Sequence, residues 1–190
     1  MAVPRELTGV WRRCALWING TRRVDYNDAL WLQAHDWFAD TRIPVDAERA
    51  PQSGPDAVFA RQRFFAGVAV WRAPVMTWDH RIDARQPSRP DTARLELKGN
   101  LLLEHGTFEY DGHQVNFLEE WVRLSAPGDR PVVRRSPAGL WIAVGEWALQ
   151  VRDTRPSGSL TAARQVRTPA GWQTVVRLTG DGTAIWVDST

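Results

Sequence analysis

The chain of 190 residues is 43% hydrophobic and 24% charged, with a formal net charge of +2. It is long enough to bury a full core as one domain, and this composition excludes a disordered or a fibrous protein. Its 11 tryptophans, against 2 tyrosines, are more than ordinary packing needs. Large rings are typical both of an apolar core and of the wall of an aromatic-binding pocket, and composition leaves both interpretations open.

Arginine supplies almost all of the positive charge, with Lys98 as the only lysine, but acidic residues are interleaved throughout and no basic run occurs. This pattern does not indicate a nucleic-acid-binding surface. The single cysteine, Cys14, cannot form an intramolecular disulfide, and the sequence has no signal-peptide core and no run long enough to cross a bilayer. We therefore expect a soluble, cytoplasmic protein that binds neither nucleic acid nor membrane. A homodimer stays open.

The first alternating segment, 7–18, begins with Gly9-Val10-Trp11. Glycine lets the backbone approach closely at a crowded barrel end, and an indole two residues later fills the floor beneath it. Asn19-Gly20 then predicts a tight hairpin into a second strand, 22–33. Strict alternation places four residues of the first strand on one face: Trp11, Arg13, Ala15 and Trp17.

Short strands and turns continue along the chain. A third strand, 37–43, leads through a Pro-rich loop, 44–56, to Asp56, which can cap a short helix, 57–65. Many short strands joined by hairpin turns indicate an antiparallel sandwich or barrel. Apart from a loop at 86–91, the alternating segments are 68–72, 76–85, 92–97, 101–105, 113–124, 139–153, 160–167, 172–178 and 183–187.

Several motifs carry a family resemblance. Gly9-Val10-Trp11 resembles the first-strand motif of the lipocalin-like (calycin) barrels. The chain is also similar to a family of bacterial lipocalin-like proteins of about this length. It is more distantly similar to fungal lipocalin-like proteins. Those fungal proteins have a similar Glu-x-Trp, matched here by Glu119/Trp121, and a later Gly-x-Trp, matched by Gly145/Trp147. The stretches similar to the bacterial family are 31–33, 38–44, 65–67, 77–78, 81–83 and 118–123.

The resemblance implies an all-β fold and a ligand site inside it. We expect one antiparallel up-and-down barrel over 1–190, with about 8–10 strands and one short helix near the barrel mouth. The resemblance brings no established substrate and no catalytic residues. Any site must therefore be inferred from the residues themselves.

The strand 113–124 carries the clearest candidate site, because Glu119, Trp121 and Arg123 share one face. If that face lines the lumen, the pKa of a buried carboxyl at Glu119 is raised, and the group can act as an acid or a base unless the guanidinium keeps it ionised. The alternative is an ion pair between Glu119 and Arg123 that ties adjacent strands together.

Other polar residues on apolar or mixed strand faces are also candidates. His80 shares a face with Trp78 and Ile82, which suggests burial, either as a proton shuttle or haem ligand or as a hydrogen-bonded core residue. Arg42 beside Asp40 repeats the arginine–carboxylate pattern, which is typical of a polar network across a lumen and also of solvated strand faces. No histidine pair has metal-site spacing, so we expect neither a metal nor another cofactor.

Three functions are compatible with these features. The preferred one is binding of a hydrophobic or aromatic small molecule in a Trp-lined cavity. The second is a cofactor-free cyclase, isomerase or decarboxylase that moves a proton with a catalytic set of Glu119, His80, Arg123 and Asp40. The third is a haem-binding barrel with His80 as the ligand. The expected ligand-binding residues are Trp121, Trp78, Trp31, Trp147, Phe117, Tyr26, Arg42, Arg13 and Trp17.

Overall fold

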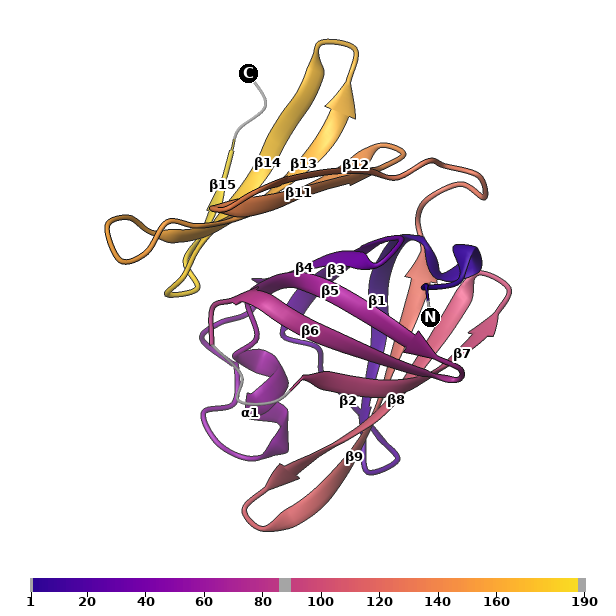
Figure 1. Ribbon diagram of the computed structural model, residues 1–190. Helices are drawn as coiled ribbons and strands as arrows, with labels where there is room; N and C mark the ends of the chain where they lie inside the picture. The colour runs from indigo at the N-terminus through magenta and orange to yellow at the C-terminus, as the bar shows by residue number, and fades with distance from the viewer. Residues whose placement is uncertain (1, 86–89, 188–190) are drawn as a thin grey trace.

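The computed structural model describes residues 2–85 and 90–187, which form a closed barrel followed by an open sheet (Figure 1). Most of the loop expected over 86–91 lies outside the described residues. No helix within the described part is long and apolar enough to cross a membrane. The first part comprises η1 (Arg5–Leu7), β1 (Gly9–Ile18), β2 (Thr21–Arg23), β3 (Asn27–Ala34), β4 (Trp37–Pro44), α1 (Pro55–Ala60), β5 (Phe64–Arg72), β6 (Val75–Asp83), β7 (Asp91–Lys98), β8 (Leu101–Tyr110) and β9 (His113–Arg123).

Eight antiparallel strands close the barrel, because β1 pairs with β3 on one side and with β9 on the other. From β3 to β9 each strand pairs with the next in sequence, which is up-and-down order. β2 adds a short hairpin at the end of β1, where Ile18 pairs with Thr21 across the Asn19-Gly20 turn. The structure thus confirms an antiparallel β-barrel with one short helix.

The last part of the chain forms a second layer and does not enter the barrel. It is a six-stranded antiparallel meander that lies over the outer face of β3 and β4 (Figure 1). Its strands are β10 (Val132–Ser136), β11 (Gly139–Val144), β12 (Trp147–Asp153), β13 (Leu160–Thr168), β14 (Gly171–Thr179) and β15 (Ala184–Trp186).

The two layers share an apolar core, and this explains the sequence of β3. Leu30 and Leu32 point outward and pack among residues of the second sheet, such as Ile142 and Leu149, whereas Trp31 points into the barrel. Because both of its faces are covered, β3 is apolar on both sides and does not alternate. Arg164 of β13 also ties the layers together by donating a 2.6 Å hydrogen bond to Asp28.

The Gly-x-Trp motif closes one end of the barrel, as the sequence predicts. The Trp11 indole donates to the Leu7 carbonyl over 3.0 Å, and the Arg123 guanidinium lies 4.1 Å above the Trp11 ring. Arg123 also donates to the carbonyl of Thr8 over 2.7 Å. A Cβ at Gly9 would lie 2.5 Å from Nη1 of Arg123, so only glycine admits this stacked guanidinium.

Tryptophans fill the closed half of the barrel. Trp31 lies at the centre of the cluster, with ring centroids 6.2 Å from Trp11, 5.6 Å from Trp78 and 5.8 Å from Trp121. The space left between this cluster and the polar groups above it is about 10 Å³, which is at most the size of one water molecule. These tryptophans therefore act mainly as packed core, and the open cavity lies toward the other end of the barrel.

The prediction that Trp17 shares a face with Trp11 and Arg13 is wrong, because β1 contains a β-bulge. The register with β9 shifts between Arg13 and Ala15, and the faces invert after this point. Leu16 now points into the barrel, and Trp17 points outward and donates to Oε1 of Glu120 over 2.8 Å.

Two other predictions in the chain need correction. The segment 139–153 is a hairpin, not one strand, since Gly145 adopts φ +58° between β11 and β12. Trp147 consequently packs in the core between the layers and not in the lumen. A short helix is confirmed, but it spans Pro55–Ala60 and Phe64 already begins β5. Asp56 lies in its first turn and does not cap it, since the N-cap residue is Gly54.

Candidate functional site

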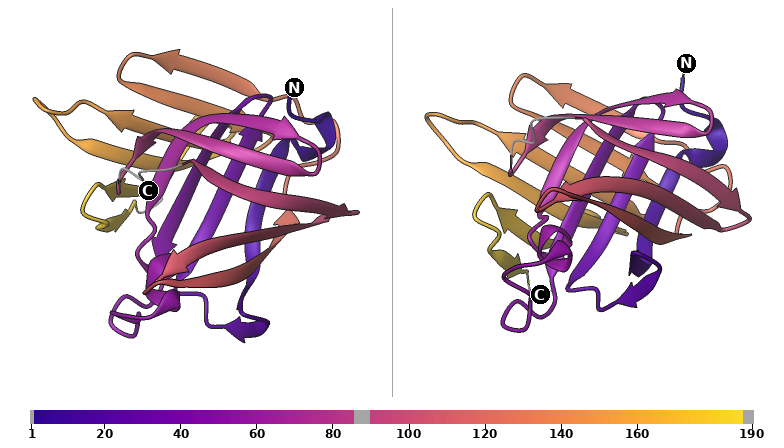
Figure 2. Two further views of the ribbon diagram at one scale, coloured as in Figure 1. Left: turned by 60° about the horizontal axis from the view of Figure 1, so that its bottom comes forward. Right: turned by 90° about the horizontal axis from the view of Figure 1, so that it is seen from below.

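The open end of the barrel contains a cavity of about 660 Å³, within the range of about 300–1,000 Å³ typical of small-molecule sites. The helix α1 lies beside this mouth (Figure 2) and is fixed there by Gly54, whose N–H donates to Tyr110 of β8 over 2.7 Å. The lining residues are Arg42, Val58, Phe59, Gln62, His80, Arg85, Pro90, Asp91, Thr92, Glu104, Thr107, Phe108, Glu109, Phe117 and Glu119.

One wall of the cavity is aromatic. Phe59 of α1 meets Phe117 of β9 with ring centroids 5.4 Å apart, and Phe108 of β8 with centroids 5.7 Å apart. Phe117 can take this position because it lies against Gly106, where a Cβ would overlap the Phe117 ring. The wall gives an apolar or aromatic ligand a contact surface next to polar groups.

The floor of the cavity is a buried network of charges centred on Glu119. Its carboxylate accepts hydrogen bonds from Arg13 and from Arg42, the latter over 3.0 Å to Oε1. Arg13 also binds both carboxylate oxygens of Asp25, and Arg42 donates to Asp40 over 3.2 Å. Burial alone would raise the pKa of Glu119, but the two guanidinium groups outweigh it and hold the pKa below its ordinary value. Glu119 is therefore ionised.

Glu104 is the second acidic residue of the floor, directly opposite Glu119 in the β8–β9 pair. Its Oε2 accepts a 3.0 Å hydrogen bond from the indole of Trp121. Burial, followed by the negative charges of Glu119 and Asp91, raises the pKa of Glu104 well above its ordinary value. Burial also raises the pKa of Asp91, despite the opposing effect of His80. The protonated, neutral form of Glu104 is thus favoured over a wider pH range than that of an ordinary glutamate.

His80 lines the cavity with its imidazole held on two sides. Nδ1 lies 2.6 Å from Oδ2 of Asp83, and the ring stacks on Phe65 at a centroid distance of 4.3 Å and an interplanar angle of 7°. The other nitrogen, Nε2, is buried and has no hydrogen-bond partner among residues 2–85 and 90–187. Such an unpaired buried nitrogen is costly unless a ligand or a proton-transfer role uses it.

A second β-bulge brings His80 and Asp83 together. Residues three positions apart on a regular strand point to opposite faces, but the register between β5 and β6 shifts between Ala66 and Gly67. Arg81 is the extra residue, so His80 and Asp83 both point inward, and Ile82 packs in the core between the layers. Gly67 permits this bulge because a Cβ there would overlap the backbone carbonyl of Asp79. The expectation that His80 and Ile82 share a face is therefore wrong.

The expected site residues fall into three groups. Glu119, His80, Arg42 and Phe117 line the cavity, and Asp40, Arg13, Trp121, Trp31 and Trp78 lie in the layer beneath it. Arg123 lies at the closed end above Trp11, so it neither pairs with Glu119 nor takes part in this site. Tyr26, Trp17 and Trp147 are not among the residues that line the cavity.

Sequence reasoning missed Glu104, Asp83, Asp91 and Gln62. Glu104 could have been found, because the Asp111-Gly112 turn fixes the register of the hairpin around it. Counting back from that turn places Glu104 opposite Glu119. Asp83 had no comparable signal, because its inward orientation depends on the bulge at Arg81.

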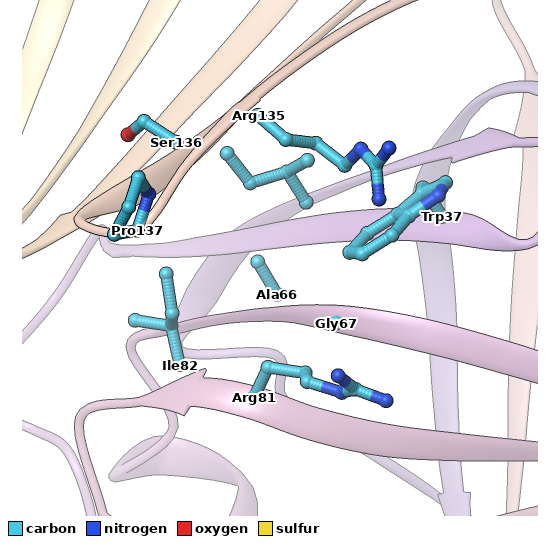
Figure 3. Close-up of a pocket in the computed structure, with 10 residues that line it drawn as sticks. Trp37, Ala66, Gly67, Arg81, Ile82, Arg135, Ser136 and Pro137 are labelled. Carbon is cyan, nitrogen blue, oxygen red and sulfur yellow. The ribbon is translucent and has the colours of Figure 1, made fainter.

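A second pocket, of about 520 Å³, lies between the two layers (Figure 3). Arg135 of β10 lies 4.7 Å above the ring of Trp37, and Arg81 extends along the other side of the pocket (Figure 3). The Arg81 side chain is 61% exposed and is already paired with Asp79 at 3.3 Å. The mouth cavity is the stronger candidate, because its charged groups are buried and their pKa values are shifted.

No family model, no curated protein and no solved structure matches this chain. Within the described residues, no three His, Cys, Asp or Glu side chains are grouped so that they could hold a metal ion. Function is therefore inferred from the geometry of the mouth cavity.

Proposed function

We propose that this protein binds a small organic molecule in the mouth cavity of its barrel, as the lipocalin-like resemblance implies. The observation that carries the proposal is the cavity itself: about 660 Å³, with an aromatic wall and a floor of buried ionisable groups. Buried charges are costly to a fold, so a cavity that exposes them to a ligand is better explained by recognition than by stability.

The ligand expected here has an apolar or aromatic part and a hydrogen-bonding end. The apolar part contacts the wall formed by Phe59, Phe108 and Phe117. The polar end faces Glu104, a carboxyl group whose raised pKa favours its neutral form, and His80, which has an unpaired ring nitrogen. The aromatic contact surface is therefore phenylalanine, whereas the tryptophans support the floor from below.

The haem alternative fits this cavity less well. His80 offers an unpaired nitrogen, but Asp91 and Glu104 line the same cavity. A porphyrin placed there would press its apolar ring system against these acidic groups. A neutral molecule that pairs with them is a better match.

A titration with Nile red, a neutral aromatic dye with a carbonyl group, tests the proposal. We expect saturable, blue-shifted emission with the unmodified protein. Val58→Trp, which fills the cavity from α1, should weaken binding by about tenfold or more, an effect of about 1.4 kcal/mol.

The matched control is Ile185→Trp, which adds the same ring to an exposed position on β15. It should bind Nile red as the unmodified protein does. Equal binding by both variants would place the dye elsewhere and contradict the proposal, as would the absence of saturable binding by the unmodified protein.

A further inference from the structure

We propose that the mouth cavity is an active site in which His80 and Glu104 act as base and acid to move a proton within a bound β,γ-unsaturated carbonyl compound. This inference rests on the proposed small-molecule binding and adds a reaction to it. The two residues come from β6 and β8 and line the same cavity. Each is supported by a separate set of contacts.

The base is Nε2 of His80. An ionised carboxylate can only accept a hydrogen bond, so the 2.6 Å contact with Asp83 favours a proton on Nδ1, and in that tautomer of the neutral imidazole the lone pair is on Nε2. Asp83 is itself held by the backbone N–H of Arg85, which donates to Oδ1 over 2.6 Å. Phe65 fixes the plane of the ring by stacking. Asp83 is thus a positioning residue, and Nε2 is the atom available to a substrate.

The acid is Glu104. Its carboxyl group lies among Glu119 on β9, Asp91 on β7, and Arg42 and Asp40 on β4. Burial and the neighbouring carboxylates raise its pKa and so favour its protonated form. The Trp121 indole donates a hydrogen bond to Oε2, so it does not accept the acidic hydrogen of Glu104. A neutral carboxylic acid in such a site can donate a hydrogen bond to a carbonyl oxygen and stabilise the charge that develops there.

The proton balance closes without a cofactor. Nε2 of His80 removes a proton from the carbon between the carbonyl group and the double bond, and the electron pair of that C–H bond forms a dienolate. Glu104 stabilises the resulting oxyanion. The imidazolium then returns the proton to the γ-carbon, the carbonyl group re-forms, and the double bond moves into conjugation. No oxidant, reductant or water molecule is consumed.

Isomerisation of cyclohex-3-en-1-one to the conjugated cyclohex-2-en-1-one tests the proposal through the ultraviolet absorbance of the product. We expect turnover by the unmodified protein and a loss of about a hundredfold or more in kcat for His80→Ala, the size of a general-base contribution. Glu104→Gln keeps an acceptor for Trp121 but loses the acid, and should lower kcat more than it changes KM.

The positioning role of Asp83 is tested by a measurement that a purely structural role would not change. Asp83→Asn should lower kcat, leave KM nearly unchanged and alter the pH profile of kcat, because the preferred tautomer of His80 changes. Asp83→Glu should restore part of the rate. Equal pH profiles for the unmodified protein and Asp83→Asn would remove Asp83 from the mechanism.

Nile red binding, measured in parallel, separates the two proposals and shows that each variant is folded. Dye binding retained in His80→Ala together with lost turnover supports catalysis. Dye binding by the unmodified protein, with no more isomerisation than His80→Ala shows, overturns the catalytic proposal and leaves binding intact. If the unmodified protein shows no saturable Nile red binding, the binding proposal is overturned instead.

Discussion

Glu104 and Glu119 lie directly opposite each other on β8 and β9, yet the pKa of Glu104 is raised and that of Glu119 is lowered. The difference follows from their partners. Glu119 receives hydrogen bonds from two guanidinium groups, whereas Glu104 receives one from the neutral indole of Trp121. Two like charges at this spacing would repel, and the neutral state of Glu104 avoids that cost.

The stability of the protein should fall as the pH rises above the ordinary pKa of a glutamate side chain, and Glu104 should be a cause. Its folded-state pKa lies above the unfolded value, so the stability it contributes is fully present below the unfolded pKa and is lost as the pH rises through the folded pKa. The slope should approach about 1.4 kcal/mol per pH unit for one proton. Urea unfolding at a series of pH values, followed by tryptophan fluorescence, measures it.

Glu104→Gln is the matched variant for that measurement, because it keeps the shape and cannot ionise. Over this pH range its unfolding free energy should vary less than that of the unmodified protein. A curve parallel to that of the unmodified protein would mean that folding does not raise the pKa of Glu104.

Arg42→Gln should destabilise the protein strongly. The change leaves Asp40 and Glu119 with less compensation in a buried site, and breaking a buried pair in this way costs about 3–5 kcal/mol. Arg12→Gln is the control, since Arg12 makes a comparable 3.0 Å contact with Asp28 but its side chain is 56% exposed. That change should cost about 1 kcal/mol or less. Similar losses in the two variants would argue against a buried charge network.

Arg123→Met should lower stability without affecting the mouth cavity. It removes the guanidinium that stacks on Trp11 and binds the Thr8 carbonyl, and we expect a loss of about 1–3 kcal/mol. Because Arg123 lies at the closed end, Nile red should bind the folded variant as it binds the unmodified protein. A marked loss of dye affinity would mean that Arg123 contributes to the ligand site.

Gly67→Ala should disturb the site from a distance. A Cβ at position 67 would overlap the Asp79 carbonyl, so the bulge that orients His80 and Asp83 must shift. We expect a loss of about 1–3 kcal/mol in unfolding free energy, the usual cost of overpacking. Gly180→Ala is the control, because Gly180 also lacks a positive φ and a Cβ there would come no closer than 3.2 Å to Leu160, so this change should cost less.

The sequence by itself determined most of the local elements and the motif at the closed end of the barrel. Alternation and the Asn19-Gly20 and Asp111-Gly112 turns located hairpins, and Gly9 with Trp11 located the closed end. These features depend on residues close together in the chain. The pairing of Glu104 with Glu119 was also within reach of the sequence, because a tight turn fixes the register of both strands.

Only the tertiary structure decided which side chains reach the cavity. Two β-bulges, one after Arg13 and one at Arg81, turn Trp17 outward and Asp83 inward. The last strands form a separate sheet, which places Trp147 in the core between the layers. The physical reason is the period of two along a strand. One extra residue exchanges the buried and outward faces, and where that residue falls depends on pairing with a distant strand.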